Sequence, residues 1–129
     1  ADPSRTAVRH RLARLLFFAD EPQKARTHLE HAIALNPEAV DARLLLATQY
    51  IVERRAADAM EQVQAILAMQ PAHQQANRLV GHLYMAIGDT IKGVEYLDRF
   101  TEYYREGRSA ELFKQLKKQW DDKLQGPQH

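Results

Sequence analysis

Apolar residues recur along this chain at the three- and four-residue spacing of amphipathic helices. The segment from Asp41 to Ile51 carries apolar residues at i, i+3, i+4 and i+7 and contains neither Gly nor Pro. No window shows the strict alternation that is typical of a strand. The pattern therefore predicts an all-α fold, with helices over residues 6–19, 23–35, 39–53, 56–69, 73–87, 90–105 and 109–124.

Pro and Gly residues mark the ends of several of these helices. Pro22 suits the first turn of a helix, where its missing N–H is not needed. Gly88 suits a helix C-terminus that requires a left-handed residue. Pro37 and Pro71 each end a helix, since the residue before a Pro is driven out of helical dihedral angles.

The two prolines that end helices lie 34 residues apart, and this interval is a repeat of the whole chain. Shifting the sequence by 34 residues aligns side chains of similar size in three copies. The matched sets are Leu12-Ala13, Leu46-Ala47 and Val80-Gly81; Leu16, Tyr50 and Tyr84; Ala25, Ala59 and Gly93; Leu29, Val63 and Leu97; and Ala32, Ile66 and Phe100. We assign the copies to residues 6–39, 40–73 and 74–107, with tails at 1–5 and 125–129 and a capping helix at 108–124.

Small residues within each copy predict how its two helices pack. Ala47 with Ala59, and Gly81 with Gly93, allow two helix axes to approach to about 8–10 Å. A single helix pair of this size cannot bury its apolar face, so the copies are expected to stack around one continuous core. The predicted architecture is an α-solenoid, and the family resemblance described next implies the right-handed form.

These positions resemble those of the tetratricopeptide repeat family, whose unit is a helix–turn–helix of 34 residues. The resemblance covers residues 6–107 and has departures. Polar residues replace the large aromatic residue that opens each unit of the family, and they are Arg9, Arg43 and Asn77. Asp20 and Arg54 replace the Gly between the two helices, and Arg105 replaces the closing Pro of the third copy. The resemblance implies a module that binds a protein or peptide partner.

The segment after the third copy is expected to form a terminal helix. Gly107 stops the preceding helix and Ser109 offers an N-cap. One side of this helix carries Leu112, Phe113, Leu116, Trp120 and Leu124. A solenoid needs a terminal cap, so we predict that this side covers the third copy. The alternative is a helix that docks on a partner.

Composition and charge exclude several classes of function. The 129 residues carry a net charge of +1 and no Cys, which excludes a disulfide framework, Cys-ligated zinc and a thiol nucleophile. There is no Gly-rich phosphate loop and no Gly-x-Ser-x-Gly motif. His28 and His31 lack a third metal ligand at a supporting spacing. We therefore expect no enzyme activity, no cofactor and no bound metal, and no apolar run is long enough to cross a membrane.

The resemblance also implies a concave groove lined by the first helix of each copy. The residues expected there are His10, Arg14 and Phe17; Leu44, Thr48 and Ile51; and Arg78, His82 and Met85. Arg beside apolar side chains suits a partner with apolar anchors and a carboxylate. Alternatively, Phe17, Ile51 and Met85 pack between helices. The groove residues with which chaperone adaptors of the family hold a C-terminal carboxylate are absent, since His10, Leu45, Gln75 and Leu79 stand there beside Arg14.

The function expected from these features is a non-enzymatic interaction module that binds a protein or peptide partner. Many bacterial members of the family of this size are assembly or secretion factors of the envelope, so the resemblance permits a periplasmic or membrane-tethered, periplasm-facing location, which we favour over the cytoplasm. One alternative is a scaffold that associates with itself. Another is RNA binding through Arg5, Arg9, His10, Arg11 and Arg14, although a nearly neutral chain does not favour nucleic acid.

Overall fold

The computed structural model describes Arg11 and residues 21–125, with the side chains of residues 121–125 left out of the description. The described chain consists of α2 (Pro22–Leu35), α3 (Val40–Val52), α4 (Ala56–Met69), α5 (Gln74–Ala86), α6 (Thr90–Arg105) and α7 (Ser109–Gln125). No strand occurs among these residues. Each helix differs from its predicted bounds by at most one residue at either end, and the expected helix over 6–19 lies outside the described residues.

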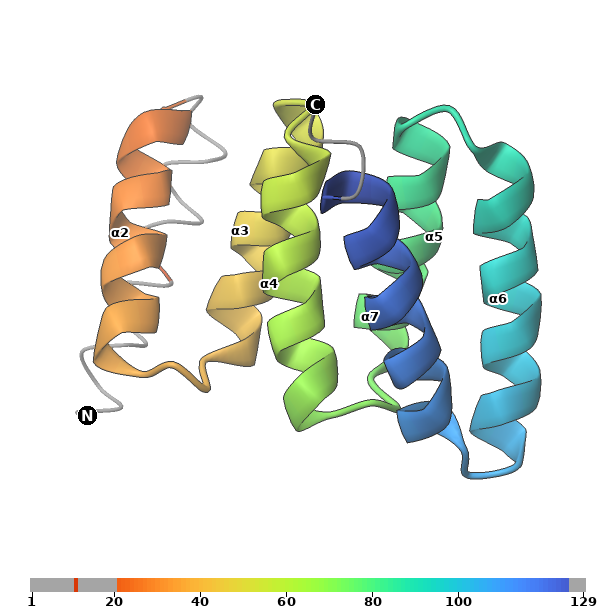
Figure 1. The fold of residues 1–129 in the computed structure, drawn as a ribbon. Coiled ribbons are helices and arrows are strands. Elements are labelled where there is room, and N and C mark those ends of the chain that lie inside the picture. The colour runs from red at the N-terminus through yellow and green to blue at the C-terminus, as the bar shows by residue number, and fades with distance from the viewer. Residues whose placement is uncertain (1–10, 12–20, 126–129) are drawn as a thin grey trace.

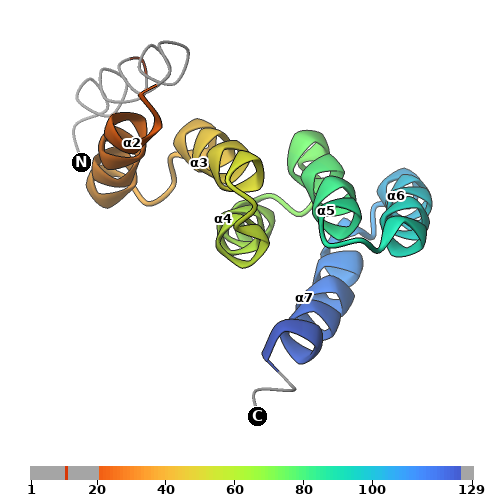
Figure 2. The ribbon, with the colours of Figure 1, turned by 90° about the horizontal axis from the view of Figure 1, so that it is seen from above.

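Helices α2 to α6 stack in chain order as a solenoid of antiparallel helices, and α7 folds back beside α4 (Figure 1). α3 packs on α4 and α5 packs on α6, and the two pairs meet where α5 packs against both α3 and α4. α2, the second helix of the first copy, packs on α3. Seen from above, α3 and α5 lie on one side of the stack and α4 and α7 on the other (Figure 2). This arrangement confirms the predicted all-α repeat solenoid.

Two glycines and one arginine end helices with left-handed backbone. Gly88 follows α5 with φ 89° and Gly107 follows α6 with φ 72°, which confirms their predicted roles. Arg54 follows α3 with φ 60°, one repeat before Gly88. The position therefore demands the left-handed conformation even where the chain has no Gly, and Arg54 adopts it at a steric cost.

One predicted helix cap is wrong. α7 begins at Ser109 itself, so this residue lies inside the first turn instead of preceding it. The Ser109 side chain is buried, and its Oγ has no hydrogen-bond partner among the described residues. By contrast, Asp89 Oδ1 accepts a hydrogen bond from the Lys92 N–H at the start of α6 (3.1 Å), a standard N-cap.

The core confirms the role predicted for the small residues. Ala47 and Ala59 are fully buried in the second copy. In the third, a Cβ on Gly93 would lie 2.7 Å from the Gly81 carbonyl oxygen, so this crossing of α5 and α6 has no room for a side chain. Most buried side chains from α3 to α7 form one cluster, but Leu29, Ala32, Ala42 and Leu46 form a second cluster between α2 and α3. The described core is therefore divided in two, and the prediction of one continuous core is wrong at the first copy.

Two of the three polar residues that replace the family's opening aromatic residue, Arg43 and Asn77, bridge two copies, and the third, Arg9, lies outside the described residues. Asn77 Nδ2 donates to the Pro71 carbonyl oxygen (3.1 Å), and Asn77 Oδ1 accepts from the Tyr96 hydroxyl (2.6 Å). One repeat earlier, Arg43 Nε donates to the Pro37 carbonyl oxygen (3.0 Å) and its Nη1 donates to Gln62 Oε1 (2.9 Å). Both networks connect the inter-repeat turn, the first helix and the second helix, so hydrogen bonds replace the packing of an aromatic ring.

The terminal helix α7 closes the core on the side away from α3 and α5. It packs on α4 and α6, and the side chains of Leu112, Leu116 and Trp120 are at least 97% buried. The Trp120 ring stands edge-on to Tyr84 with 5.2 Å between ring centroids. The prediction that this helix covers the core is confirmed for these residues, and the Leu124 side chain lies outside the description.

Candidate partner-binding surfaces

Of the nine residues predicted to line one groove, the six that the structure describes do not share one surface. His10, Arg14 and Phe17 lie outside the described residues, as do Arg5 and Arg9 of the basic segment. On α3, Leu44 is 8% exposed and belongs to the main core cluster. The Thr48 hydroxyl donates to the Leu44 carbonyl oxygen of its own helix (2.9 Å). These two residues therefore present little side chain to a partner.

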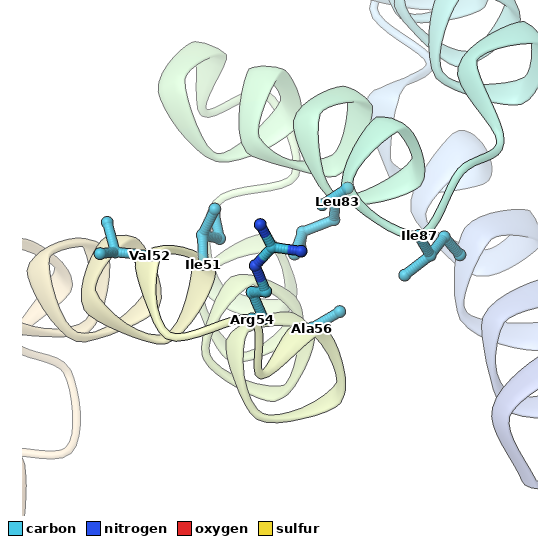
Figure 3. A pocket seen from close by; sticks show the side chains of 7 residues that line it. Ile51, Val52, Arg54, Ala56, Leu83 and Ile87 are labelled. Atoms are coloured by element: carbon cyan, nitrogen blue, oxygen red, sulfur yellow. The ribbon is translucent and has the colours of Figure 1, made fainter.

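Ile51 opens instead into a pocket of about 430 Å³ where α3, α4 and α5 meet (Figure 3). The pocket is lined by Ile51, Val52, Arg54, Ala56, Leu83, Ala86 and Ile87. Val52 is 68% exposed and Ile87 is 37% exposed, so the lining is apolar and open to solvent. Such a surface suits an apolar side chain of a partner.

Arg54 supplies the charge at this pocket. Its left-handed backbone directs the side chain over the pocket, where it extends between Ile51 and Leu83 (Figure 3). No residue in the described part of the chain forms an ion pair or a hydrogen bond with the Arg54 guanidinium. Arg55, its neighbour, is by contrast bound to Asp58 (2.8 Å) and stacked over the Tyr50 ring. Arg54 is thus available to a carboxylate of a partner.

Arg78 and His82 lie in a different pocket, between α5 and α6. This pocket of about 470 Å³ is lined by Gln74, Arg78, His82, Leu97, Phe100, Thr101 and Tyr104. Met85, the third residue predicted for this helix, is 36% exposed, and its Cγ lies close to the backbone of Gly93 on α6. The predicted stripe is therefore divided between a surface that faces α3 and one that faces α6.

Sequence reasoning did not find most of the residues around Ile51. Val52, Leu83, Ala86 and Ile87 were not assigned to a site, although Val52 and Ala86 occupy the same position of successive copies. In the sequence, Arg54 stands out only because it replaces the Gly that the family has between the two helices. Its position could have identified it, because the backbone there is left-handed. A bulky residue is uncommon in that conformation, which raises the backbone energy.

The described residues hold no arrangement typical of catalysis. No group of three His, Asp or Glu among them is placed to hold a metal ion. The marked pKa shifts belong to structural groups: burial raises the pKa of Tyr96, whose hydroxyl is bound to Asn77, and burial also raises that of Tyr84. Hydrogen bonds from Gln115 and Arg99 lower the pKa of Tyr103. These tyrosines hold helices together and do not converge on a cavity.

The fold and its surfaces define a helical-repeat module with two apolar pockets, each of which has an Arg at its edge. The model of the tetratricopeptide repeat family matches residues 19–83, half of the chain, and the chain belongs to this family. No curated protein matches the chain. Repeats of this family are protein–protein interaction modules in general, and the chain is one of them. None of the helices in the described part of the chain is long and apolar enough to cross a membrane.

Proposed function

We propose that the chain is a non-enzymatic module whose partner inserts an apolar side chain, followed by a carboxylate, into the pocket of Ile51. The observation that carries this proposal is the position of Arg54, a cation without an ion-pair partner among the described residues, at the edge of an open apolar pocket. Every other charged group at the end of α3 already has a partner: Glu53 pairs with Arg26 (2.7 Å) and Arg55 with Asp58 (2.8 Å).

Two interactions of moderate strength account for the proposed affinity. Burial of one aliphatic side chain of the partner against Ile51, Leu83 and Ile87 contributes about 1.5–3 kcal/mol. A charge-assisted hydrogen bond between Arg54 and a carboxylate contributes about 1.5–3 kcal/mol. Arg suits this place because its planar guanidinium binds a carboxylate at two points while its stem covers apolar neighbours.

Peptide selection followed by point variants tests the proposal. A library of random peptides displayed on phage is selected against the chain, and the recovered peptides are measured by fluorescence anisotropy. We expect an apolar residue with a nearby Asp or Glu in the recovered peptides. Arg54→Gly should weaken their binding about tenfold without unfolding the chain, and Val52→Asp should abolish it. Glu61→Ala, on an exposed part of α4, is the control that should change neither.

A further variant tests whether the partner contacts only the pocket of Ile51 or also Arg78 of the predicted groove. Arg78→Ala should weaken binding by about 1–3 kcal/mol if Arg78 and Ile51 contact the same partner segment. If the pocket of Ile51 acts alone, Arg78→Ala leaves the affinity of the selected peptides unchanged. Peptides that bind the Val52→Asp variant as tightly as the unmodified chain would overturn the proposal.

We also propose the periplasmic face of a bacterial envelope as the setting of this module. The absence of Cys fits an oxidising compartment and a reducing one equally well, and membership of the repeat family permits the envelope setting, since many bacterial members of this size are envelope assembly factors. Fractionation of cells that produce the natural protein tests this: recovery with the periplasm or the membrane supports it, and recovery with the cytosol overturns it.

A further inference from the structure

The two helices of the second copy, α3 and α4, form a groove that receives the first helix of the next copy, α5. We call such a groove a slot, and the second copy shows which residues line a filled one. The slot residues Leu44, Val63, Ile66 and Leu67 share one buried cluster with α5, and the last three are fully buried. On the α5 side, Ala76, Val80 and Leu83 are also fully buried. A helix with a small residue and two aliphatic residues at i, i+4 and i+7 therefore fills this slot.

The corresponding slot in the third copy is open. One repeat later, Leu44, Val63, Ile66 and Leu67 become Arg78, Leu97, Phe100 and Thr101, and all four line the pocket between α5 and α6. Arg78 and Thr101 are exposed. The helix that follows in the chain, α7, does not enter this slot, because it packs on α4 and α6 at the opposite side of the stack (Figure 2).

We propose that the slot between α5 and α6 binds an amphipathic helix of a partner protein, and that this helix carries carboxylates toward Arg78 and His82. The helical form of the occupant follows from the filled slot, since the same backbone framework one repeat earlier receives α5. The floor of the slot, Leu97 and Phe100, is apolar and matches the aliphatic face of such a helix.

The charge of the slot specifies the acidic character of the occupant. Arg78 stands where the filled slot has Leu44, and His82 where it has Thr48. No carboxylate is among the described residues that line the pocket, and none of the described residues forms an ion pair with Arg78. A purely apolar helix would desolvate Arg78 without compensation, whereas a helix with Asp or Glu at its edge would pair with it.

The same argument disfavours a second copy of this chain as the occupant. The segment with the register of a first helix is residues 6–19, which contains Arg9, Arg11 and Arg14 and no Asp or Glu. Placed in the slot, it would bring like charges to Arg78. Charge complementarity therefore favours an acidic helix of a partner over residues 6–19 of a second copy. This second surface is independent of the pocket of Ile51, so either proposal can fail without the other.

A pair of synthetic helices tests the proposal. Both are helix-stapled peptides with Ala, Val and Leu at the spacing of Ala76, Val80 and Leu83; one carries Glu at the flanking positions and the other Lys. Binding to the whole chain is measured by fluorescence anisotropy. We expect the Glu peptide to bind and the Lys peptide to bind at least about tenfold more weakly. Arg78→Glu should reverse this preference, and Lys117→Glu on exposed α7 makes the same charge change as a control that should leave it intact.

The remaining outcomes are decisive against the proposal. Failure of both peptides to bind, or equal binding of the two, overturns it. Loss of binding in Val52→Asp would show that the peptides use the pocket of Ile51 and not the slot. Concentration-dependent association of the chain in sedimentation experiments, abolished by Arg78→Glu, would make the occupant a second copy. Thermal unfolding of every variant shows that the comparison is made between folded proteins.

Discussion

The slot between α3 and α4 is filled, while the slot between α5 and α6 is open, although the 34-residue repeat builds both from matching positions. Leu44 and Leu67 of the filled slot correspond to Arg78 and Thr101 of the open one. The apolar floor is retained, because Ile66 corresponds to Phe100. The comparison shows that the 34-residue repeat sets the positions of the slots. The residues at the edge of each slot differ, and we infer that they decide which helix the slot can bind.

The position of α7 explains why the chain leaves its last slot open. The Trp120 ring packs edge-on against Tyr84 inside the main cluster. On the α6 side, Gln115 hydrogen-bonds Arg99 and the Tyr103 hydroxyl, and the Arg99 and Arg108 guanidinium groups lie over the Tyr103 ring. These contacts join α7 to α5 and α6, and α7 also packs on α4, so the helix closes the core without covering the surface of Arg78.

The largest expected effect comes from removing the contact that holds α7 in place. Trp120→Ala should lower the free energy of unfolding by about 3–5 kcal/mol, because it leaves a large cavity beside Tyr84. Urea unfolding measures it, with Lys117→Ala on the exposed face of α7 as the control. An unchanged unfolding midpoint would mean that α7 is a free arm in solution, and it would then compete for the open slot.

Exchanging one residue between the slots tests the comparison directly. Leu44→Arg places the residue of the open slot in the filled one, where a guanidinium would be buried beside apolar residues of α5. It should lower the free energy of unfolding by about 2–4 kcal/mol. The reverse change, Arg78→Leu, should alter it by less than about 0.5 kcal/mol, because Arg78 is exposed. Similar losses in both variants, measured by urea unfolding, would show that the open slot is part of the core.

The 34-residue register was enough to predict the helices and the small residues at their crossings. The Gly81–Gly93 approach illustrates why: a close crossing requires small residues at fixed positions in both helices, and such a requirement is visible in the sequence. Gly88 and Gly107 were likewise predictable, since left-handed helix ends favour one residue type.

The sequence could not separate the two surfaces of α5. Residues at i, i+4 and i+7 share one face of a helix, but which neighbour that face meets depends on the curvature of the stack. Arg78 and His82 therefore line a pocket with α6, while Ile51 faces Leu83. The same limit applies to α7, whose apolar side is evident in the sequence although the choice between two available grooves is made by tertiary contacts such as Trp120–Tyr84.

A pH titration probes the tyrosine bridge of the third copy, although burial also raises the pKa of Tyr50 in the second copy. Burial raises the pKa of Tyr96, whose hydroxyl donates to Asn77, whereas the matching bridge of the second copy joins Gln62 to Arg43. A tyrosine with a raised pKa in the folded state stabilises the protein fully below its ordinary pKa of about 10, and this contribution is lost as the pH rises above that value. We expect unfolding to become easier by about 1 kcal/mol at pH 11 on account of Tyr96.

Two variants test whether Tyr96 causes this loss of stability at high pH. Tyr96→Phe should lower the stability at neutral pH by about 1 kcal/mol, since Asn77 Oδ1 loses its donor, but it should flatten the decline above pH 10. Tyr104→Phe, at an exposed position of α6, should leave the decline as it is. The measurement is urea unfolding between pH 8 and pH 11, and an unchanged decline in Tyr96→Phe would assign the effect to other groups such as Tyr84.

The smallest expected effect concerns the matching turns after α3 and α5, where Arg54 and Gly88 have the same left-handed backbone. Arg54→Gly should raise the free energy of unfolding by about 0.5–1 kcal/mol, since the gain from relieving the backbone is partly offset by the greater freedom of Gly in the unfolded chain. Gly88→Arg should lower it by a similar amount through the backbone alone, because no atom lies within 4 Å of the position of an added Cβ. Thermal unfolding measures both changes. If Arg54→Gly raises the stability while weakening the binding of the selected peptides, the chain retains a strained arginine at a place where Gly would be more stable, and the retained guanidinium serves the partner. If Arg54→Gly lowers the stability, the Arg54 side chain stabilises the fold itself and its assignment to the pocket of Ile51 loses its physical basis.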